Sequence, residues 1–226
     1  MKGKFGMMMV AGSGALGGHV VTRNRQGVAV RTKTTPINRR STSQTGTRQT
    51  FSTLSQNWRA LSEAQRQSWI NAAPDFTRHN VFGDTYHPTG KNLYMIINAN
   101  ILIAGGTVVS APPAETQPVA LTAVVFATNT SAAQSITFLP TPVPANTVVV
   151  IQATRPLSAG IESAGKQFRQ VVVIPAAGTS PENSLAAYTA KFGAPITGKK
   201  IFYNLFTIHM LSGLRSLPTQ IGGITA

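Results

Sequence analysis

Cysteine is absent from this chain of 226 residues, which excludes disulfides, thiolate zinc sites and cysteine nucleophiles and suits a reducing cytoplasm. Acidic residues are scarce, because six Asp or Glu stand against 20 Lys or Arg. No run approaches the roughly 20 apolar residues of a membrane-spanning helix. The apolar run at 7–11 is also shorter than the core of a signal peptide, which has about 7 to 15 apolar residues. The sequence therefore predicts a soluble, non-secreted protein with no membrane partner.

Positive charge is concentrated near the N-terminus. Residues 1–48 contain nine Lys or Arg and no Asp or Glu, whereas residues 49–226 contain eleven and six. Such an excess predicts a negatively charged partner, either an acidic protein surface or nucleic acid, and composition does not choose between them. The candidate partner-binding residues are Arg23, Arg25, Arg31, Lys33, Arg39, Arg40 and Arg48.

A glycine-rich segment at 12–17, GSGALG, matches the G-x-G-x-x-G pattern of dinucleotide-binding loops. That chemistry needs a helix that starts at the glycines and an acidic residue about 20 positions later. Here a β-prone run at 20–22 follows, and the first acidic residue is Glu63. We therefore expect no cofactor, and interpret the glycines as flexible or closely packed backbone.

Residues 18–33 predict a basic β-hairpin, because two β-prone runs flank the turn-forming residues Asn24-Arg25-Gln26-Gly27. Its charges either protect a solvated strand edge or form a docking surface for an acidic partner. The lack of a nearby carboxylate favours docking. Residues 34–50 are rich in Ser, Thr, Gln and Arg and have no apolar period, so we expect an extended arm that also acts as a linker.

Two helices are predicted after the arm. An apolar stripe at three- and four-residue steps defines the first helix. Ser62 and Gln65 form a capping-box pattern that begins the second helix, which Pro74 ends. Trp58 and Trp69 then either clasp a small core, the interpretation we favour, or form an exposed stacking platform for nucleic acid. The residues of the stripe are Phe51, Leu54, Trp58 and Leu61.

A third helix is predicted from Thr89 as N-cap to Gly105-Gly106, after a loop that contains His79 and His87. The two histidines have no carboxylate or Cys at ligand spacing, so we expect no metal site. The glycines and lysine at 83–91 do not have the spacing of a phosphate-binding loop. We expect Leu93, Tyr94, Ile97, Asn100 and Ile101 on the buried side of the helix.

The order of these features resembles the N-terminal region of virion structural proteins from tailed bacteriophages and prophages. The resemblance covers residues 12–113 and rests on the basic RNRQG turn, the helix pair FSTLSQNWRALSEAQRQSW and the segment HPTGKNLYMIINANILIAGG. Proteins of this kind often carry Asn-Pro-x-Thr in the arm, where this chain has INRRST. The resemblance implies a virion component. The basic residues predict that it binds acidic surfaces of capsid, connector or tail subunits. We also expect homo-oligomers, because an unpaired hairpin and an extended arm gain stability chiefly from partners.

Residues 119–226 have short apolar or alternating runs separated by turns, which favours an antiparallel β-sandwich. The segments VVVIQATRPLSAG and KKIFYNLFTIHMLSGLRS resemble fibronectin type III-like domains. A short helix is expected from Ser180-Pro181-Glu182 to Lys191, with Pro181 at its first position. The predicted strands are 119–128, 135–139, 147–154, 168–174 and 200–211.

The expected fold is α+β: an N-terminal lead, basic hairpin and arm at 1–48, a three-helix module at 49–110, a linker at 111–118 and an immunoglobulin- or fibronectin-like sandwich at 119–226. Glu115, Glu162 and Glu182 have no second acid nearby in sequence, so we expect no enzyme. The leading hypothesis is a non-enzymatic virion protein located in the capsid, at the head–tail connector or in the tail and assembled in the host cytoplasm. The alternative is a basic nucleic-acid-binding or genome-packaging protein. The absence of aromatic residues between Val20 and Thr50 favours assembly.

Overall fold

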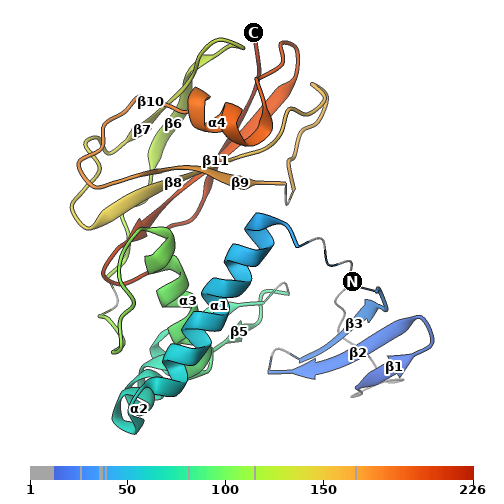
Figure 1. Cartoon of the computed structure of the whole chain (residues 1–226), viewed down its shortest axis with the longest axis vertical. Helices are drawn as coiled ribbons and strands as arrows, with labels where there is room; N and C mark the ends of the chain where they lie inside the picture. Colours follow the sequence, from blue (N-terminus) through green and yellow to red (C-terminus); the bar gives the residue numbers. More distant parts are fainter. Residues whose placement is uncertain are drawn as a thin grey trace. The chain divides into compact units, whose positions relative to one another are not determined.

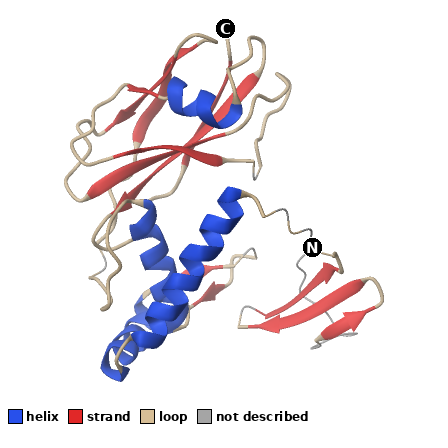
Figure 2. Ribbon diagram, in the orientation of Figure 1, coloured by secondary structure: helices blue, strands red, loops and turns tan. Residues whose placement is uncertain are grey.

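The computed structural model describes residues 13–25, 27–35, 38, 40–80, 82–114, 116–165 and 167–226 and has an α+β fold (Figures 1 and 2). The chain divides into two compact units, Met1–Met95 and Ile96–Ala226. The boundary lies within helix α3 (Gly90–Ile103) and not in the expected linker at 111–118. The last turns of this helix therefore belong to the second unit.

Among the described residues, the first unit begins with an antiparallel sheet of three strands, in the order β1 (Gly14–Leu16), β2 (His19–Asn24) and β3 (Gly27–Thr32). Its first strand was not predicted, because the glycines here were interpreted only as flexible or closely packed backbone. Leu16 pairs with His19, so Gly17 and Gly18 form a tight turn, and Gly17 has a φ of 55° that glycine adopts without strain. The glycines of the GSGALG segment that the structure describes thus belong to a strand and its turn, with no helix after them.

Helix α1 (Thr42–Ala60) begins well before the predicted position, so the expected extended arm is wrong from Thr42 onward. Local hydrogen bonds explain the early start. The Ser41 hydroxyl accepts from the Gln44 amide at 3.3 Å, and three Thr hydroxyls donate to carbonyls four residues earlier. These contacts are polar and have no apolar period, so hydrophobic spacing does not predict the first turns of the helix.

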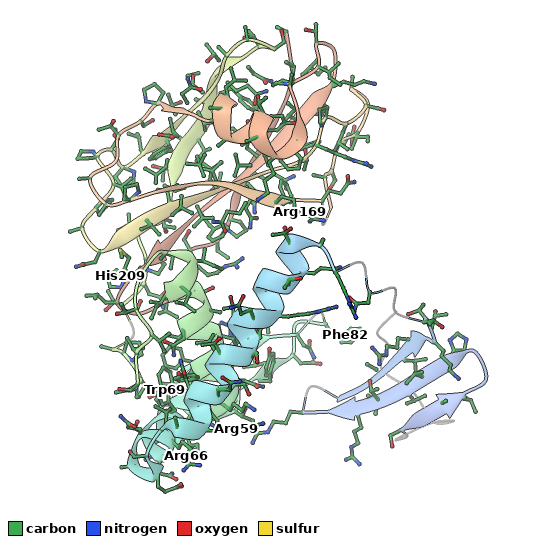
Figure 3. All side chains as sticks on the ribbon, in the orientation of Figure 1. Arg59, Arg66, Trp69, Phe82, Arg169 and His209 are labelled. Atoms are coloured by element: carbon green, nitrogen blue, oxygen red, sulfur yellow. The ribbon has the colours of Figure 1, made fainter. Side chains whose placement is uncertain are left out.

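The helical core of the first unit has the predicted form. In the capping box of α2 (Glu63–Ala72), the Ser62 amide donates to Gln65 Oε1 at 2.9 Å, and the Gln65 amide donates to Ser62 Oγ at 3.2 Å. A 3₁₀ turn, η1 (Ala73–Asp75), follows α2 at Pro74. The rings of Trp58 and Trp69 each lie 5.3 Å from the ring of Tyr94, so the two tryptophans do clasp a core. Trp69 is labelled in the helical part of the unit in Figure 3.

The apolar stripe predicted on α1 is confirmed at Leu54, which is fully buried, and is wrong at Phe51, which is 48% exposed.

Short strands β4 (Arg78–His79) and β5 (Thr85–Tyr86) form a hairpin before α3. Thr89 Oγ1 caps α3 by accepting from the Asn92 amide at 3.2 Å. The helix ends as predicted, because the amides of Gly105 and Gly106 donate to carbonyls of its last turn. All five residues expected on its buried side are buried.

The second unit contains two antiparallel sheets that share one core (Figure 2). One has the order β10 (Glu182–Asn183), β7 (Gln134–Leu139), β6 (Thr122–Asn129). The other has the order β12 (Thr219–Ile224), β11 (Lys200–His209), β8 (Thr147–Ala153), β9 (Arg169–Ile174). The five predicted strands are therefore present, each within a few residues of its expected ends. The core includes Ile136 and Phe138 from the first sheet and Ile151, Tyr203 and Leu205 from the second.

Two expectations for this unit need correction. The predicted helix begins later, as α4 (Leu185–Phe192), because Glu182 and Asn183 pair with Ile136 and Ser135 as strand β10. Strand β12 was not predicted, since its Gly222 and Gly223 weaken the β pattern. These glycines are required by packing, because a Cβ at Gly222 would lie 2.6 Å from the Phe202 ring.

The end of α3 is fixed to the second unit by specific contacts. Asn100 Nδ2 donates to the carbonyl of Gly213 at 2.8 Å, and Ala104 belongs to one buried apolar cluster with Val150 and Phe206. Gly213 has a φ of 62°, and a Cβ there would lie 2.6 Å from the carbonyl oxygen of Ile97. These contacts explain why the boundary between the units falls within the helix.

Candidate partner-binding surface

The basic residues of the N-terminal sheet are exposed and lie near the ends of the β2–β3 pair. Arg23 and Arg25 lie at the turn between the two strands, while Arg31 and Lys33 lie at the opposite end. Arg23 pairs with Val28 and Arg31 pairs with Val20. Directly opposed residues share a face and successive residues alternate, so Arg23 and Arg31 lie on opposite faces of the sheet. The positive charge therefore surrounds the sheet and does not form one flat patch.

The other predicted residues belong to the arm and to α1. Arg39 lies outside the described residues. Arg40 is exposed and has a φ of 46°, directly before the Ser41 cap. Arg48 is exposed on α1, and its Nη1 donates to Asn38 Oδ1 at 2.9 Å. The seven predicted residues thus fall into one group on the sheet and another at the start of α1.

The first two turns of α1 are a feature that the sequence analysis missed. All residues from 42 to 49 are exposed, and they include Gly46 and three threonines, which are poor helix formers. Helices in proteins gain most of their stability from packing one face against other elements. A polar segment of low helix propensity that projects without packing is a candidate contact surface for another molecule. The Ser41 cap followed by threonines is the signal that could have located it.

The sheet itself has little apolar burial. Val21 is 4% exposed, Val20, Val28 and Val30 are half-buried, and Leu16 is 65% exposed. Leu16, Val21, Val28 and Val30 share one face, as the register of the three strands requires. This face combines apolar side chains with the guanidinium of Arg23, so it suits a partner that offers both apolar contact and negative charge.

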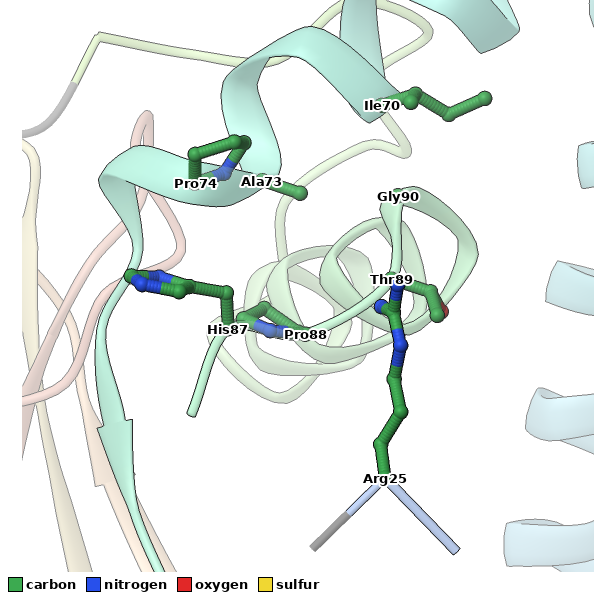
Figure 4. Close-up of a pocket in the computed structure, with 8 residues that line it drawn as sticks. All are labelled: Arg25, Ile70, Ala73, Pro74, His87, Pro88, Thr89 and Gly90. Carbon is green, nitrogen blue, oxygen red and sulfur yellow. The ribbon is translucent and has the colours of Figure 1, made fainter. Parts of the chain in front are cut away.

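A pocket with a volume of about 440 Å³ lies beside the end of α2 and the start of α3 (Figure 4). Ile70, Ala73, Pro74 and Pro88 give it an apolar lining, and His87, Thr89, Gly90 and Arg25 complete it. Gly90 permits the close approach of the two helices, because a Cβ there would lie 2.8 Å from the Ile70 amide nitrogen. The pocket suits an apolar side chain and offers an imidazole and a guanidinium for polar contact. No sequence motif pointed to it.

A buried polar network lies between the sheets of the second unit. Tyr203 Oη donates to Gln134 Oε1 at 2.5 Å and lies 3.1 Å from Ser184 Oγ. Tyr188 Oη donates to the Thr154 carbonyl at 3.0 Å. Burial raises the pKa of Tyr203 to about 12, although the hydrogen bond with Ser184 lowers it in part. Burial, and secondarily the Tyr203 phenol, raises the pKa of Tyr188 as well. The network joins both sheets to α4, and burial favours the neutral form of both phenols.

The remaining titratable residues are dispersed. Glu63 forms an ion pair with Arg66 at 3.2 Å, and Glu182 lies in β10, where burial raises its pKa. His209 ends β11, and its Nδ1 accepts from the Ser212 amide at 3.2 Å, which ties the ring to the following turn. Glu115 lies outside the described residues. Over the described ranges, no three His, Asp or Glu side chains are grouped so that they could hold a metal ion.

Comparisons with models of protein families, with curated proteins and with solved structures find no match to the chain. In the part of the chain that the structure describes, no helix has the length and apolar character needed to cross a membrane.

Proposed function

We propose that this chain is a non-enzymatic structural protein of a tailed-bacteriophage virion. It is a capsid-associated or decoration protein, or a component of the head–tail connector or tail. It assembles through the basic N-terminal sheet and arm and displays a β-sandwich of the immunoglobulin or fibronectin type. Its partners are acidic surfaces of capsid, connector or tail subunits together with further copies of itself, and its location is the virion, assembled in the host cytoplasm.

The observation that carries this proposal is the exposed character of the N-terminal sheet. Val21 is 4% exposed, whereas Leu16 on the same face is 65% exposed. Small antiparallel sheets need an apolar face packed on something else to be stable in water. A sheet with four exposed basic residues in its strands and at their ends, and with so little burial, gains stability from a partner that covers it. The unpacked first turns of α1 support the same conclusion.

The distribution of charge favours a protein partner over nucleic acid. Arg23 and Arg31 lie on opposite faces of the sheet, so one strand of phosphates does not meet both at once. The described residues of the sheet include no Phe, Tyr or Trp on which a base could stack. A protein that wraps the sheet can present carboxylates to both faces.

Two measurements on the purified full chain test the proposal. Light scattering gives the mass, for which we expect a defined multi-copy assembly. A titration with duplex DNA at about 50 and 200 mM salt measures phosphate contacts, and we expect feeble binding. Tight binding that falls about a thousandfold over that range would indicate at least six phosphate contacts and would support genome packaging instead.

A further inference from the structure

Strand β3 is an edge of the N-terminal sheet, and its register identifies which backbone groups point outward. The Lys33 amide donates to the Gly18 carbonyl at 2.7 Å, which continues the β2–β3 ladder by one pair. Hydrogen-bonded pairs alternate with non-hydrogen-bonded pairs in an antiparallel ladder. Arg31 and Ala29 therefore bond to β2, while Val28, Val30 and Thr32 direct their N–H and C=O groups away from it.

This outer edge is open within the described residues. The sheet order ends at β3, and none of the described segments pairs with its outer side. An open edge with alternating donors and acceptors is a template for another extended chain. Arg31 lies on this strand, and Arg25 and Lys33 flank it at either end. The edge therefore combines a backbone template with positive charge along its length.

We propose that β3 binds an extended acidic segment of a partner protein by strand addition, with its outward N–H and C=O groups forming the new ladder. Arg25, Arg31 and Lys33 bind the carboxylates of that segment. This inference rests on the proposed function, because it specifies the partner of the same basic sheet. The partner is identified by its chemistry: an extended peptide that carries several Asp or Glu.

Charge disfavours a second copy of β3 as the occupant. In an antiparallel β3–β3 pair, the Arg25 end of one copy runs toward the Lys33 end of the other, so the two sets of positive charge lie along one ladder, and opposed like charges destabilise it. Nucleic acid fits less well than peptide, because phosphates accept hydrogen bonds but do not donate them. The outward carbonyls of Val28, Val30 and Thr32 would then have no donor from the partner.

The test uses the full chain and a seven-residue peptide of alternating Glu and Val, with capped termini. A matched peptide, N-methylated at every internal amide, has the same charge but cannot form a ladder. We expect the unmodified peptide to bind and the methylated one to bind at least about tenfold more weakly, as the loss of two or three hydrogen bonds implies. Equal binding by both peptides would show that charge alone accounts for the binding. That result would overturn strand addition but would leave the proposed assembly through the basic surface intact.

A second readout comes from hydrogen exchange of single amides by NMR. We expect the unmodified peptide to protect the amides of Val28, Val30 and Thr32, whereas those of Ala29 and Arg31 are already protected in the free chain. Protection that does not follow this alternation would contradict the proposal.

Variants of the chain give an independent check. Val30→Pro removes an outward N–H without breaking the β2–β3 ladder, and Val30→Ala is its control because it shortens the side chain but keeps that N–H. We expect only the proline variant to lose peptide affinity, by about tenfold. Steeply salt-dependent binding of duplex DNA with no peptide binding would overturn both this inference and the proposed function, and binding of neither probe would overturn this inference alone.

Discussion

Replacing Gly90 by Ala should destabilise the helical module of the first unit. A Cβ at this position would lie 2.8 Å from the Ile70 amide nitrogen and 2.9 Å from its Cα. Backbone atoms cannot move aside as a flexible side chain can, so α2 must shift away from α3. Overpacking of this kind costs about 1–3 kcal/mol, and the better helix propensity of Ala returns about 0.5–1 kcal/mol. We expect a net loss of about 1–2 kcal/mol in the free energy of unfolding.

Tryptophan fluorescence during urea denaturation measures this effect directly, because both tryptophans of the chain lie in this module beside Tyr94. The expected loss lowers the midpoint by roughly 0.5–1 M urea. Gly46→Ala is the matched control, since nothing lies within 4 Å of its Cβ position on the exposed start of α1. That control should leave the module as stable as before or slightly more stable. A midpoint for Gly90→Ala that equals or exceeds that of the unmodified chain would refute the packing argument.

Three further outcomes are expected. Tyr203→Phe removes the hydrogen-bond partner of buried Gln134 and should lower the free energy of unfolding of the second unit by about 1–3 kcal/mol, measured by circular dichroism. An unchanged unfolding transition would show that this hydrogen bond is dispensable. Because burial raises the pKa of Tyr203 to about 12, the folded state binds more protons above pH 10, so stability should fall between about pH 10 and 12. Absorbance at 295 nm checks this: fewer tyrosines should ionise at pH 11 in the native chain than in denaturant, and equal numbers would contradict it. Gly213→Ala, which meets the Ile97 carbonyl oxygen at 2.6 Å, should destabilise the second unit by about 2 kcal/mol or more, whereas Gly160→Ala should change little.

The elements with strong local signals were predictable from the sequence. The capping box of Ser62 and Gln65 and the stop at Gly105-Gly106 fix helix ends through contacts within a few residues, so no knowledge of the fold is needed. The five main strands of the second unit were likewise found, because each carries its own apolar pattern. The α+β class follows from these two groups of elements.

The missed elements depend on partners distant in sequence. Strand β10 has two residues and exists because it pairs with β7, and β12 contains two glycines that make room for the rings of Phe202 and Phe126. No local pattern encodes such pairing. The early start of α1 was missed for the opposite reason, since its hydrogen bonds are local but polar, and apolar spacing does not reveal them.

The candidate surface was predictable in composition but not in geometry. Charge counts alone selected Arg23, Arg25, Arg31 and Lys33, which the structure describes as exposed residues of one sheet and its ends. Their separation onto opposite faces follows from the strand register, which the sequence leaves open. The open edge of β3 appears only when that register is known, because it decides which amides point outward.

The most direct test of the account is to look for the chain in virus particles. Cultures of the organism that encodes it are induced, particles are banded by density, and the DNA-filled fraction is analysed by quantitative mass spectrometry. The account predicts peptides of this chain in that fraction, at a fixed ratio to the major capsid protein that does not change on rebanding. Recovery of the chain only from soluble fractions, while intact particles lack it, would contradict the central claim.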